Sequence, residues 1–190
     1  MIFNLNASPK IRASILAVAI VAGGSTIAYA KGYPMVGGAA MYPTKNIVQN
    51  AVNSKDHTTL VAAVKAAGLV ESLSGPGPFT VLAPTNEAFA KLPAGTVDTL
   101  VKPENKATLT SILTYHVIPG KLSAAAIKAN AAKHKGKATY KTVNGESVTF
   151  MKSGSGWAVK DAKGGTAKIT IADVNQSNGV IHVIDTVLMP

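Results

Sequence analysis

The spacing of the hydrophobic residues changes about two thirds of the way along this chain. Up to residue 132, apolar positions mostly recur every three or four residues, as in Leu60, Val64 and Ala67, which is typical of amphipathic helices. From residue 138 onward they form short runs separated by Gly and Asn, which indicates strands joined by tight turns. Helices followed by a β meander, without a repeat or a linker between them, predict a single α+β domain.

Capping and turn residues mark the ends of the expected elements. Gly68 and Pro93 each end an apolar stripe, whereas Thr85 and Ser123 are suited to cap the N-termini of helices. The pattern predicts helices over 46–52, 58–67, 86–92, 103–113 and 124–132. It predicts strands over 79–83, 115–118, 138–143, 147–152, 157–160, 167–174 and 180–188. The dipeptide Asn144-Gly145 predicts a two-residue hairpin turn in which both residues take a positive φ.

The segment from Val180 to Leu188 is the most apolar of the expected strands. We expect it to be buried on both faces and to pair with an early strand, which would join the helical half to the meander. Asn178-Gly179 supplies the turn that leads into it. Burying one such side chain is worth about 1.5–3 kcal/mol, so a chain that stops after Asn178 is expected to be unfolded or to aggregate.

Residues 1–30 have the features of a signal peptide. Lys10 and Arg12 precede an apolar run, and Ala28 and Ala30 fit a small-residue cleavage site. The run is short for a bilayer, and an uncleaved membrane anchor is the alternative interpretation. No second long apolar run follows, so no membrane span is expected after removal of the signal peptide. The expected location is therefore secreted or periplasmic.

The rest of the chain divides into a short arm and one domain. Residues 31–42 carry Gly, Pro, Met and Tyr without periodicity, so we expect a flexible N-terminal arm before a domain over 43–190. The chain is 47% hydrophobic and 15% charged, which excludes a disordered protein. It contains no Cys, which excludes a disulfide scaffold, a thiolate metal site and a Cys nucleophile.

Lysine dominates the charge of the chain. There are 19 basic and 9 acidic residues, a net charge of +10, and the only Arg lies in the predicted signal peptide. Without Arg the domain lacks the bidentate donors that read guanine, so no specific nucleic-acid partner is expected. Seven lysines and no acidic residue lie between Asn105 and Gly145, among them Lys133, Lys135 and Lys137. This stretch is either a solvated face or a contact for an anionic surface or polysaccharide.

The sequence holds no recognisable catalytic or metal-binding motif. Its four His residues lack metal-ligand spacing, and His116 and His182 alternate with apolar neighbours, as buried, hydrogen-bonded rings do. Asp173 and Asp185 could approach each other across strands, but isolated acidic residues more often cap or face solvent. Asn175 begins an Asn-Gln-Ser sequon, which matters only in a host that glycosylates. A hydrolase is therefore disfavoured, and we expect no catalytic residue, cofactor or metal ion.

Three segments occur in the order and spacing of one family's motifs. They are FTVLAPTNEAF at 79–89, LTYHVIPG at 113–120 and SNGVIHVIDTVLMP at 177–190. Together they resemble the fasciclin (FAS1) domain family, in its small secreted bacterial single-domain form. Asn86 stands where the family usually has Asp, and Asn also caps helices, so the fold is expected to hold. The motif residues with expected structural roles are Thr85, Asn86, Phe89, Asn178, Gly179, His182 and Asp185.

The resemblance implies a wedge of β-strands with helices packed at one side, and adhesion or matrix contact rather than catalysis. In animal members adhesion is attributed to the Tyr-His segment, which corresponds here to Tyr115 and His116. Because both residues stand among apolar neighbours, a structural role is the alternative to direct contact. The expected partner is a cell-surface or matrix protein or an anionic polysaccharide, and the oligomeric state is unknown. The alternative function is a carrier of a small apolar ligand in a crevice of the domain.

Overall fold

One curved sheet organises the structure, a computed structural model that describes residues 32–190. Its strands are β3 (Phe79–Pro84), β4 (Val117–Pro119), β5 (Lys137–Lys141), β6 (Ser147–Ser153), β7 (Gly156–Lys160), β8 (Thr166–Gln176) and β9 (Gly179–Ile184). They pair in the order β4-β3-β9-β8-β7-β6-β5, with β3 and β9 parallel and the other neighbours antiparallel. The predicted signal peptide, its cleavage site and Lys31 lie outside the described residues.

The two ends of the sheet approach each other. Just beyond β5, the backbone N–H of Val143 donates to the carbonyl of Val117 in β4 at 2.8 Å, and that of Asn144 donates to Thr114 at 3.3 Å. The sheet is therefore nearly closed into a wedge, with one hydrophobic cluster inside it and another between its outer face and the helices. The predicted fold class, an α+β wedge of strands with helices packed at one side, is confirmed.

The parallel pair β3–β9 divides these two clusters. Val81 and Val183 face the helices, whereas Leu82 and Ile184 face the interior of the wedge. All six residues of β9 are buried, as expected for a strand covered on both faces. The predicted pairing of this last strand with an early strand is confirmed. The strand ends at Ile184 rather than Leu188, although Leu188 remains fully buried.

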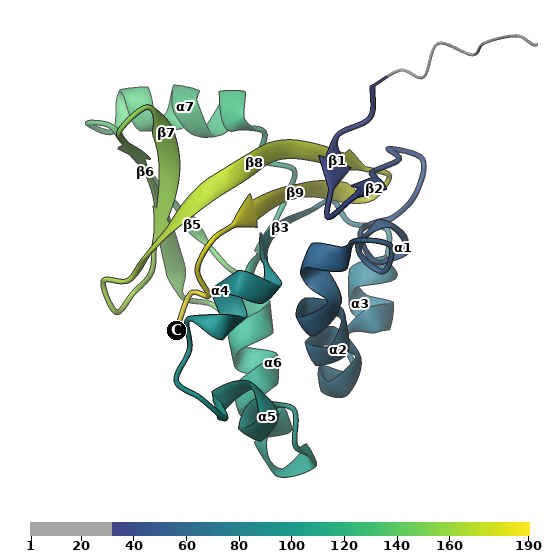
Figure 1. The fold of residues 1–190 in the computed structure, drawn as a ribbon. Coiled ribbons are helices and arrows are strands. Elements are labelled where there is room, and N and C mark those ends of the chain that lie inside the picture. Colours follow the sequence, from purple (N-terminus) through teal and green to yellow (C-terminus); the bar gives the residue numbers. More distant parts are fainter. Residues whose placement is uncertain (1–31) are drawn as a thin grey trace, which may run out of the picture. The chain divides into compact units, whose positions relative to one another are not determined.

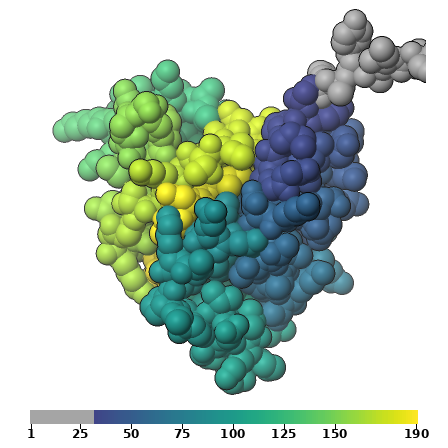
Figure 2. Space-filling view, in the orientation of Figure 1, coloured from purple at the N-terminus to yellow at the C-terminus, as the bar shows by residue number. Residues whose placement is uncertain are grey.

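Most helices pack on the outer face of β3 and β9. They are α1 (Ile47–Ala51), α2 (Thr58–Ala67), α3 (Val70–Ser74), α4 (Asn86–Ala90), α5 (Thr96–Leu100) and α6 (Lys106–Tyr115). Two 3₁₀ turns, η1 (Lys55–His57) and η2 (Pro103–Asn105), precede α2 and α6. Helix α7 (Ala124–Lys133) lies at the other end of the curved sheet and contributes Ile127 and Ala131 to the inner cluster (Figure 1). In Figure 2 the helical segment, in blue and teal, and the meander, in green, occupy different sides of the visible face.

The sequence pattern missed helices α3 and α5. Neither has a side-chain hydrogen bond at its N-cap, and α5 buries none of its residues. Short helices without a cap or an apolar stripe leave no periodic signal. In contrast, Thr85 and Ser123 cap α4 and α7 as predicted, each accepting a hydrogen bond of 3.2 Å from the backbone N–H three residues later.

The expected strand over 115–118 is wrong in its first half. Tyr115 is the last residue of α6, His116 is the C-cap, and β4 begins at Val117. Nδ1–H of His116 donates to the carbonyl of Ile112 at 2.8 Å, one turn back in the helix. This bond extends the helical turn through a run of residues whose apolar character alone predicts a strand.

The expected flexible arm over 31–42 is also wrong from Val36 onward. Strands β1 (Met35–Val36) and β2 (Ala39–Ala40) form a hairpin, and the side chains of Val36 and Met41 are buried in the outer cluster. Lys55 donates its backbone N–H to the carbonyl of Gly37 at 3.1 Å, which fastens the turn to the body. A two-residue strand is too short to show a period in the sequence, so the hairpin was not predicted.

The predicted turn between β5 and β6 has a different geometry. Only Gly145 of the Asn144-Gly145 pair has a positive φ, of 98°. The backbone N–H of Thr142 donates to Glu146 at 2.8 Å and that of Gly145 donates to Thr142 at 2.9 Å. The loop therefore holds three residues with Gly in the left-handed position, which is the next most common hairpin connection.

Candidate functional site

The outer face of the β meander carries a regular array of lysine and threonine side chains. Side chains alternate between the faces of a strand, and the inward positions of β5–β8 include fully buried apolar residues such as Phe150 and Val159. The ladder places Lys137 opposite Met151, Thr139 opposite Thr149, Thr149 opposite Lys160, and Lys168 opposite Ala158. We call the following outward residues the lysine face: Lys137, Thr139, Lys141, Thr149, Met151, Lys160, Thr166 and Lys168.

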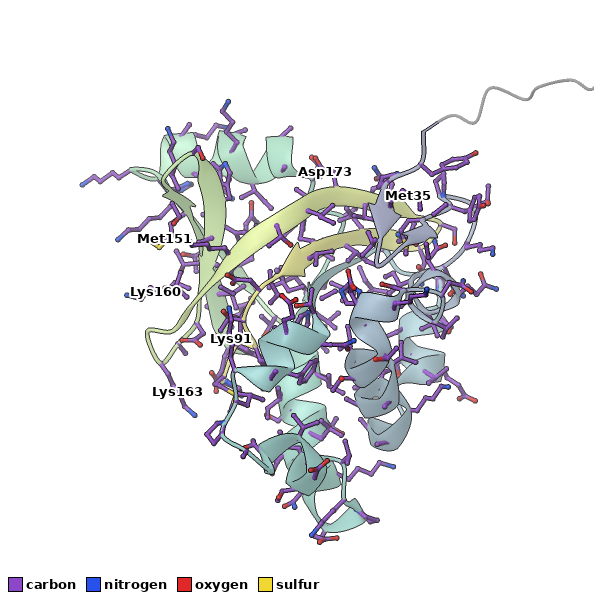
Figure 3. All side chains as sticks on the ribbon, in the orientation of Figure 1. Met35, Lys91, Met151, Lys160, Lys163 and Asp173 are labelled. Atoms are coloured by element: carbon purple, nitrogen blue, oxygen red, sulfur yellow. The ribbon has the colours of Figure 1, made fainter. Side chains whose placement is uncertain are left out.

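The lysine face projects away from the helices. Figure 3 shows Met151 and Lys160 pointing outward from the green strands, on the side opposite α1–α3. The four lysine residues of this face are exposed. Thr139 and Thr149 share a hydrogen bond of 2.9 Å on this face, which links β5 to β6. The result is a sheet face with exposed lysine side chains on three of its strands, β5, β7 and β8.

Positive charge is concentrated in this half of the molecule. Residues 32–115 contain six lysines and five acidic residues, whereas residues 116–190 contain ten lysines and four acidic residues. Three of those four acids accept hydrogen bonds from backbone N–H groups: Asp161 from Gly165, Asp173 from Ala124 and Asp185 from Lys168. Glu146, in the turn between β5 and β6, is exposed. The meander therefore produces a positive field that attracts anionic partners.

The three predicted lysine contacts come together at one corner. Lys133 ends α7, Lys135 lies in the following turn with a φ of 54°, and Lys137 begins β5. All three are exposed, and Lys137 belongs to the lysine face. The sequence reasoning missed Lys160 and Lys168, because only the pairing of the strands places them on the same face of the sheet as Lys137. The alternation of polar and apolar residues in 166–169 is the signal that could have found Lys168.

Tyr115 is fully buried and links three parts of the wedge. Its hydroxyl donates to the carbonyl of Ser147 at 3.1 Å and accepts from the backbone N–H of Ala162 at 2.9 Å. Burial raises the pKa of the phenol, an effect that the Ala162 N–H opposes and the charges of Asp161 and Glu146 reinforce. In this structure the Tyr115 side chain is not accessible to a partner.

His116 is buried beside it, with ring centroids 6.4 Å apart. While Nδ1–H donates to Ile112, Nε2 accepts from the backbone N–H of Leu188 at 3.0 Å. Burial lowers the pKa of His116 to about 4, although the Ile112 carbonyl and Asp161 favour the charged form. The ring is therefore neutral at pH 7 and has a structural role, which is the alternative that the sequence left open.

His182 and Asp185, from the third motif segment, are also held by contacts within the domain. His182, fully buried, donates from Nε2 to the carbonyl of Leu122 at 2.8 Å and accepts at Nδ1 from the N–H of Asp173. Burial lowers its pKa. Asp185 forms an ion pair of 3.6 Å with Lys91. Burial alone would raise the pKa of Asp185, but the Lys168 N–H, the Thr186 hydroxyl and Lys91 together hold it below its usual value.

Asp173 and Asp185, which could have approached each other across strands, bind different partners. Asp173 accepts a hydrogen bond of 2.7 Å from the backbone N–H of Ala124 at the start of α7, while Asp185 binds Lys91 and Lys168. They share none of these partners. Within residues 32–190, no group of three or more His, Asp or Glu side chains is placed to hold a metal ion.

Asn86 and Asn178 each connect segments that are distant in sequence. Oδ1 of Asn86 accepts from the backbone N–H of Thr59 at 3.0 Å, and its Nδ2 donates to the carbonyl of Lys55 at 2.8 Å. Asn86 thus supports the start of α2, while Thr85 caps its own helix. Phe89, in the same motif, is buried in the outer cluster.

Asn178 is the centre of a larger set of bonds. Its Oδ1 accepts from the N–H of Ile47 at 3.0 Å, and its Nδ2 donates to the carbonyls of Leu73 and Gly75 at 2.8 and 2.9 Å. The next residue, Gly179, is a necessary glycine, because a Cβ there would lie 2.0 Å from the carbonyl oxygen of Phe79.

The helices enclose a small apolar cavity. It has a volume of about 50 Å³ and is lined by residues such as Leu60, Val64, Leu73 and Leu113. Ligand pockets usually hold about 300–1,000 Å³. The cavity in this conformation is therefore a packing defect rather than a site for a ligand of ordinary size.

The fold and motifs agree with comparisons to known proteins. A sequence model of the Fasciclin domain matches residues 55–190, so this chain belongs to the fasciclin domain family. It is 46% identical over 190 residues to Protein sll1483 of Synechocystis sp., covering 92% of this chain and 97% of that protein. It is 39% identical over 145 residues to Immunogenic protein MPB70 of Mycobacterium bovis, covering 74% of this chain and 66% of that protein.

One further relative has a name that refers to the cell surface, and one solved structure has the same fold. The chain is 37% identical over 160 residues to Cell surface glycolipoprotein MPB83 of Mycobacterium bovis, covering 82% of this chain and 64% of that protein. A solved FAS1 domain pair from the insect cell adhesion molecule Fasciclin I matches with a TM-score of 0.67 at 16% identity, over 77% of this chain and 51% of that one. The chain thus spans about half of the pair, and the match confirms the fold. Within residues 32–190, no helix is both long and apolar enough to cross a membrane.

Proposed function

We propose that this protein is a non-catalytic, extracytoplasmic interaction module that contacts an anionic polymer of a cell surface or matrix through the lysine face. The observation that carries this function is that Lys137, Lys141, Lys160 and Lys168 lie exposed on one face of the sheet. Glu146, in the turn between β5 and β6, is an exposed acidic residue close to them in sequence. Lysine acts as a point charge without the directional fork of Arg. Such a face suits a flexible polyanion whose charges are spaced along a chain.

An extracytoplasmic location is supported by two observations. The first 30 residues have the composition of a signal peptide, and one relative is named a cell-surface glycolipoprotein. We further expect that cleavage after Ala30 produces a mature protein beginning at Lys31. N-terminal sequencing of protein from the extracytoplasmic fraction tests this, and recovery of an intact Met1 form in membranes would contradict it.

The lysine face is tested by removing its charge and comparing polymer binding. The variant Lys137→Gln, Lys141→Gln, Lys160→Gln and Lys168→Gln removes four positive charges from the face. The matched control, Lys55→Gln, Lys65→Gln, Lys102→Gln and Lys106→Gln, removes four from the helical half. Binding of both proteins to immobilised polygalacturonate is measured at 50 and 300 mM salt.

We expect the lysine-face variant to bind at least about tenfold more weakly, since each exposed charge contributes up to about 1 kcal/mol. The control should keep its affinity within about twofold, and wild-type binding should weaken at high salt because the charges are screened beyond about 10 Å. Equal losses in the two variants would show that only net charge matters. Binding that is insensitive to salt would contradict an electrostatic contact.

A further inference from the structure

A hollow of about 190 Å³ opens between α7 and the strands β7 and β8. Its lining includes Ile127 of α7, Trp157 of β7, Ile169, Thr170 and Ala172 of β8, and His182 of β9. It is several times larger than the cavity among the helices and lies in a different part of the molecule. None of the functional residues considered above, apart from His182, belongs to it.

The hollow exists because β8 changes partners. The ladder between β7 and β8 covers only Ala158–Lys160, while β8 continues along β9 with two register shifts between Ile169 and Val174. Beyond Lys168, therefore, β7 and β8 separate, and α7 lies over the gap. Asp173, in a strained left-handed conformation with a φ of 57°, accepts from the N–H of Ala124 and holds the start of α7.

The floor of the hollow offers no free polar group of its own. Both ring nitrogens of His182 are engaged, Nε2 with Leu122 and Nδ1 with Asp173. The hydroxyl of Thr170 donates to the carbonyl of Val183 at 3.3 Å. The walls, Ile127, Ile169 and Trp157, are apolar and partly or fully buried. The preformed lining therefore favours the flat, apolar face of a ring.

Cationic groups flank the hollow. Lys152 lies directly opposite Trp157 in the β6–β7 ladder and hence on the same face of the sheet. Lys128 follows Ala124, a lining residue, by one helical turn on α7, so the two share a helix face. Both lysines are exposed, and the carboxylate of Asp173 at the rim is bonded to the Ala124 N–H. An occupant that combines a ring with a negative charge is complementary to this arrangement.

We propose that the hollow binds one pyranose ring that carries a negative group, stacked on the indole of Trp157 with its charge toward Lys152. An aromatic side chain offers a ring a large flat contact at little entropic cost. The hollow is smaller than pockets for drug-sized ligands, so it accommodates one ring rather than several. This inference rests on the proposed function for the source of the ring, which is one residue of the acidic polymer.

Trp157 makes the test direct, since it is the only Trp in the chain and its fluorescence reports on the hollow alone. The purified protein is titrated with trigalacturonate and with the neutral sugar maltotriose. We expect a saturable change in fluorescence with trigalacturonate, and binding of maltotriose at least about fivefold weaker because the attraction of Lys152 is lost. The absence of a saturable change with trigalacturonate would overturn the inference.

Two variants locate the contact. Lys152→Gln should weaken trigalacturonate binding at least about threefold, whereas Lys102→Gln, an exposed lysine of the helical half, should leave it within about 1.5-fold. Trp157→Leu, followed by calorimetry and a thermal melt, should remove detectable binding while the protein stays folded. Equal effects of the two lysine variants, or full binding by a folded Trp157→Leu protein, would contradict the site.

These measurements separate the hollow from the lysine face. If the four-lysine variant of that face loses polygalacturonate binding but keeps the fluorescence response to trigalacturonate, both proposals stand. If Trp157 fluorescence does not change with trigalacturonate while the protein still binds the polymer through the lysine face, only the proposal for the hollow is wrong. If polymer binding is lost only in Lys152→Gln, the proposal for the lysine face is wrong and the proposal for the hollow stands.

Discussion

The backbone N–H of Leu188 donates a hydrogen bond to Nε2 of His116 at 3.0 Å, and both residues are buried. The bond fastens the last residues of the chain to the end of α6, 72 positions earlier. Its geometry requires an unprotonated Nε2, which the bond from Nδ1–H to Ile112 provides by fixing the tautomer. One imidazole thus joins the C-terminal segment to the helical half, and its protonation state controls that link.

The C-terminal segment beyond β9 should contribute substantially to stability. Leu188→Ala removes a fully buried side chain from the inner cluster, and we expect it to lower the free energy of unfolding by about 2–5 kcal/mol. Met189→Ala is the control, since Met189 is half-buried and keeps its backbone bond to Asp161; we expect a loss below about 1.5 kcal/mol. Urea unfolding followed by circular dichroism measures both. Similar values for the two variants would show that the segment is peripheral.

Acid should destabilise the protein in a defined pH range. Burial holds the pKa of His116 at about 4, below the value near 6.5 of an unfolded chain, so the unfolded state binds the proton first. The contribution of neutral His116 to the free energy of unfolding is therefore fully present above pH 6.5. It falls as the pH is lowered toward 4, by on the order of 3 kcal/mol for His116 alone. His57 and His182, whose pKa values burial also lowers, should add to the loss.

The variant His116→Gln tests the assignment of this acid sensitivity. We expect it to be less stable than wild type at pH 7, because the bonds to Ile112 and Leu188 are altered, but to lose less stability between pH 6.5 and 4.5. Free energies of unfolding from urea titrations at several pH values provide the comparison. A pH profile parallel to that of wild type would mean that His116 does not titrate in this range.

The N-terminal hairpin should be part of the folded core. Val36→Ala removes buried methyl groups, and we expect a loss of about 2 kcal/mol. Met35→Ala, the adjacent change on the opposite face, affects a side chain that is 58% exposed and should alter stability by less than about 0.5 kcal/mol. Thermal melts of the two variants make the comparison. If Val36→Ala has the same melting temperature as wild type, the hairpin does not contribute to the stability of the core.

Local chemistry explains what the sequence predicted correctly. The caps Thr85 and Ser123, the stop at Gly68 and the apolar strand after Asn178 each depend on residues within one turn of the chain. The wedge of strands was predicted only from the resemblance of three segments to the family's motifs. Tyr115 shows where local reasoning fails, because its apolar surroundings suit a buried helix end as well as a strand.

The candidate sites depend on long-range register instead. Lys160 lies beside Thr149 only because β6 and β7 pair at that offset, and Trp157 borders a hollow only because β8 leaves β7 after Lys168. No periodicity in a single segment specifies such pairings. Burial likewise decided between the two roles of His116, and burial is a property of the assembled fold.

Asn178 should be among the most sensitive polar positions in the domain. Asn178→Ala leaves the N–H of Ile47 and the carbonyls of Leu73 and Gly75 without their side-chain partner, and an unsatisfied buried group costs about 1–3 kcal/mol. We therefore expect a loss of about 3 kcal/mol or more. Asn178→Asp should be no better, because it keeps the acceptor for Ile47 but places a carboxylate oxygen against two carbonyls.

The control for this last prediction is Asn175→Ala, three residues earlier on an exposed part of β8. Its side chain donates to the carbonyl of Asp173 at 3.1 Å in an exposed setting, where water replaces the lost partner, so we expect a change below about 0.5 kcal/mol. Urea unfolding of all three variants gives the order of stability. If Asn178→Asp were as stable as wild type, the two donor bonds to Leu73 and Gly75 would contribute nothing, and the turn into β9 would be fixed by Gly179 and strand pairing alone.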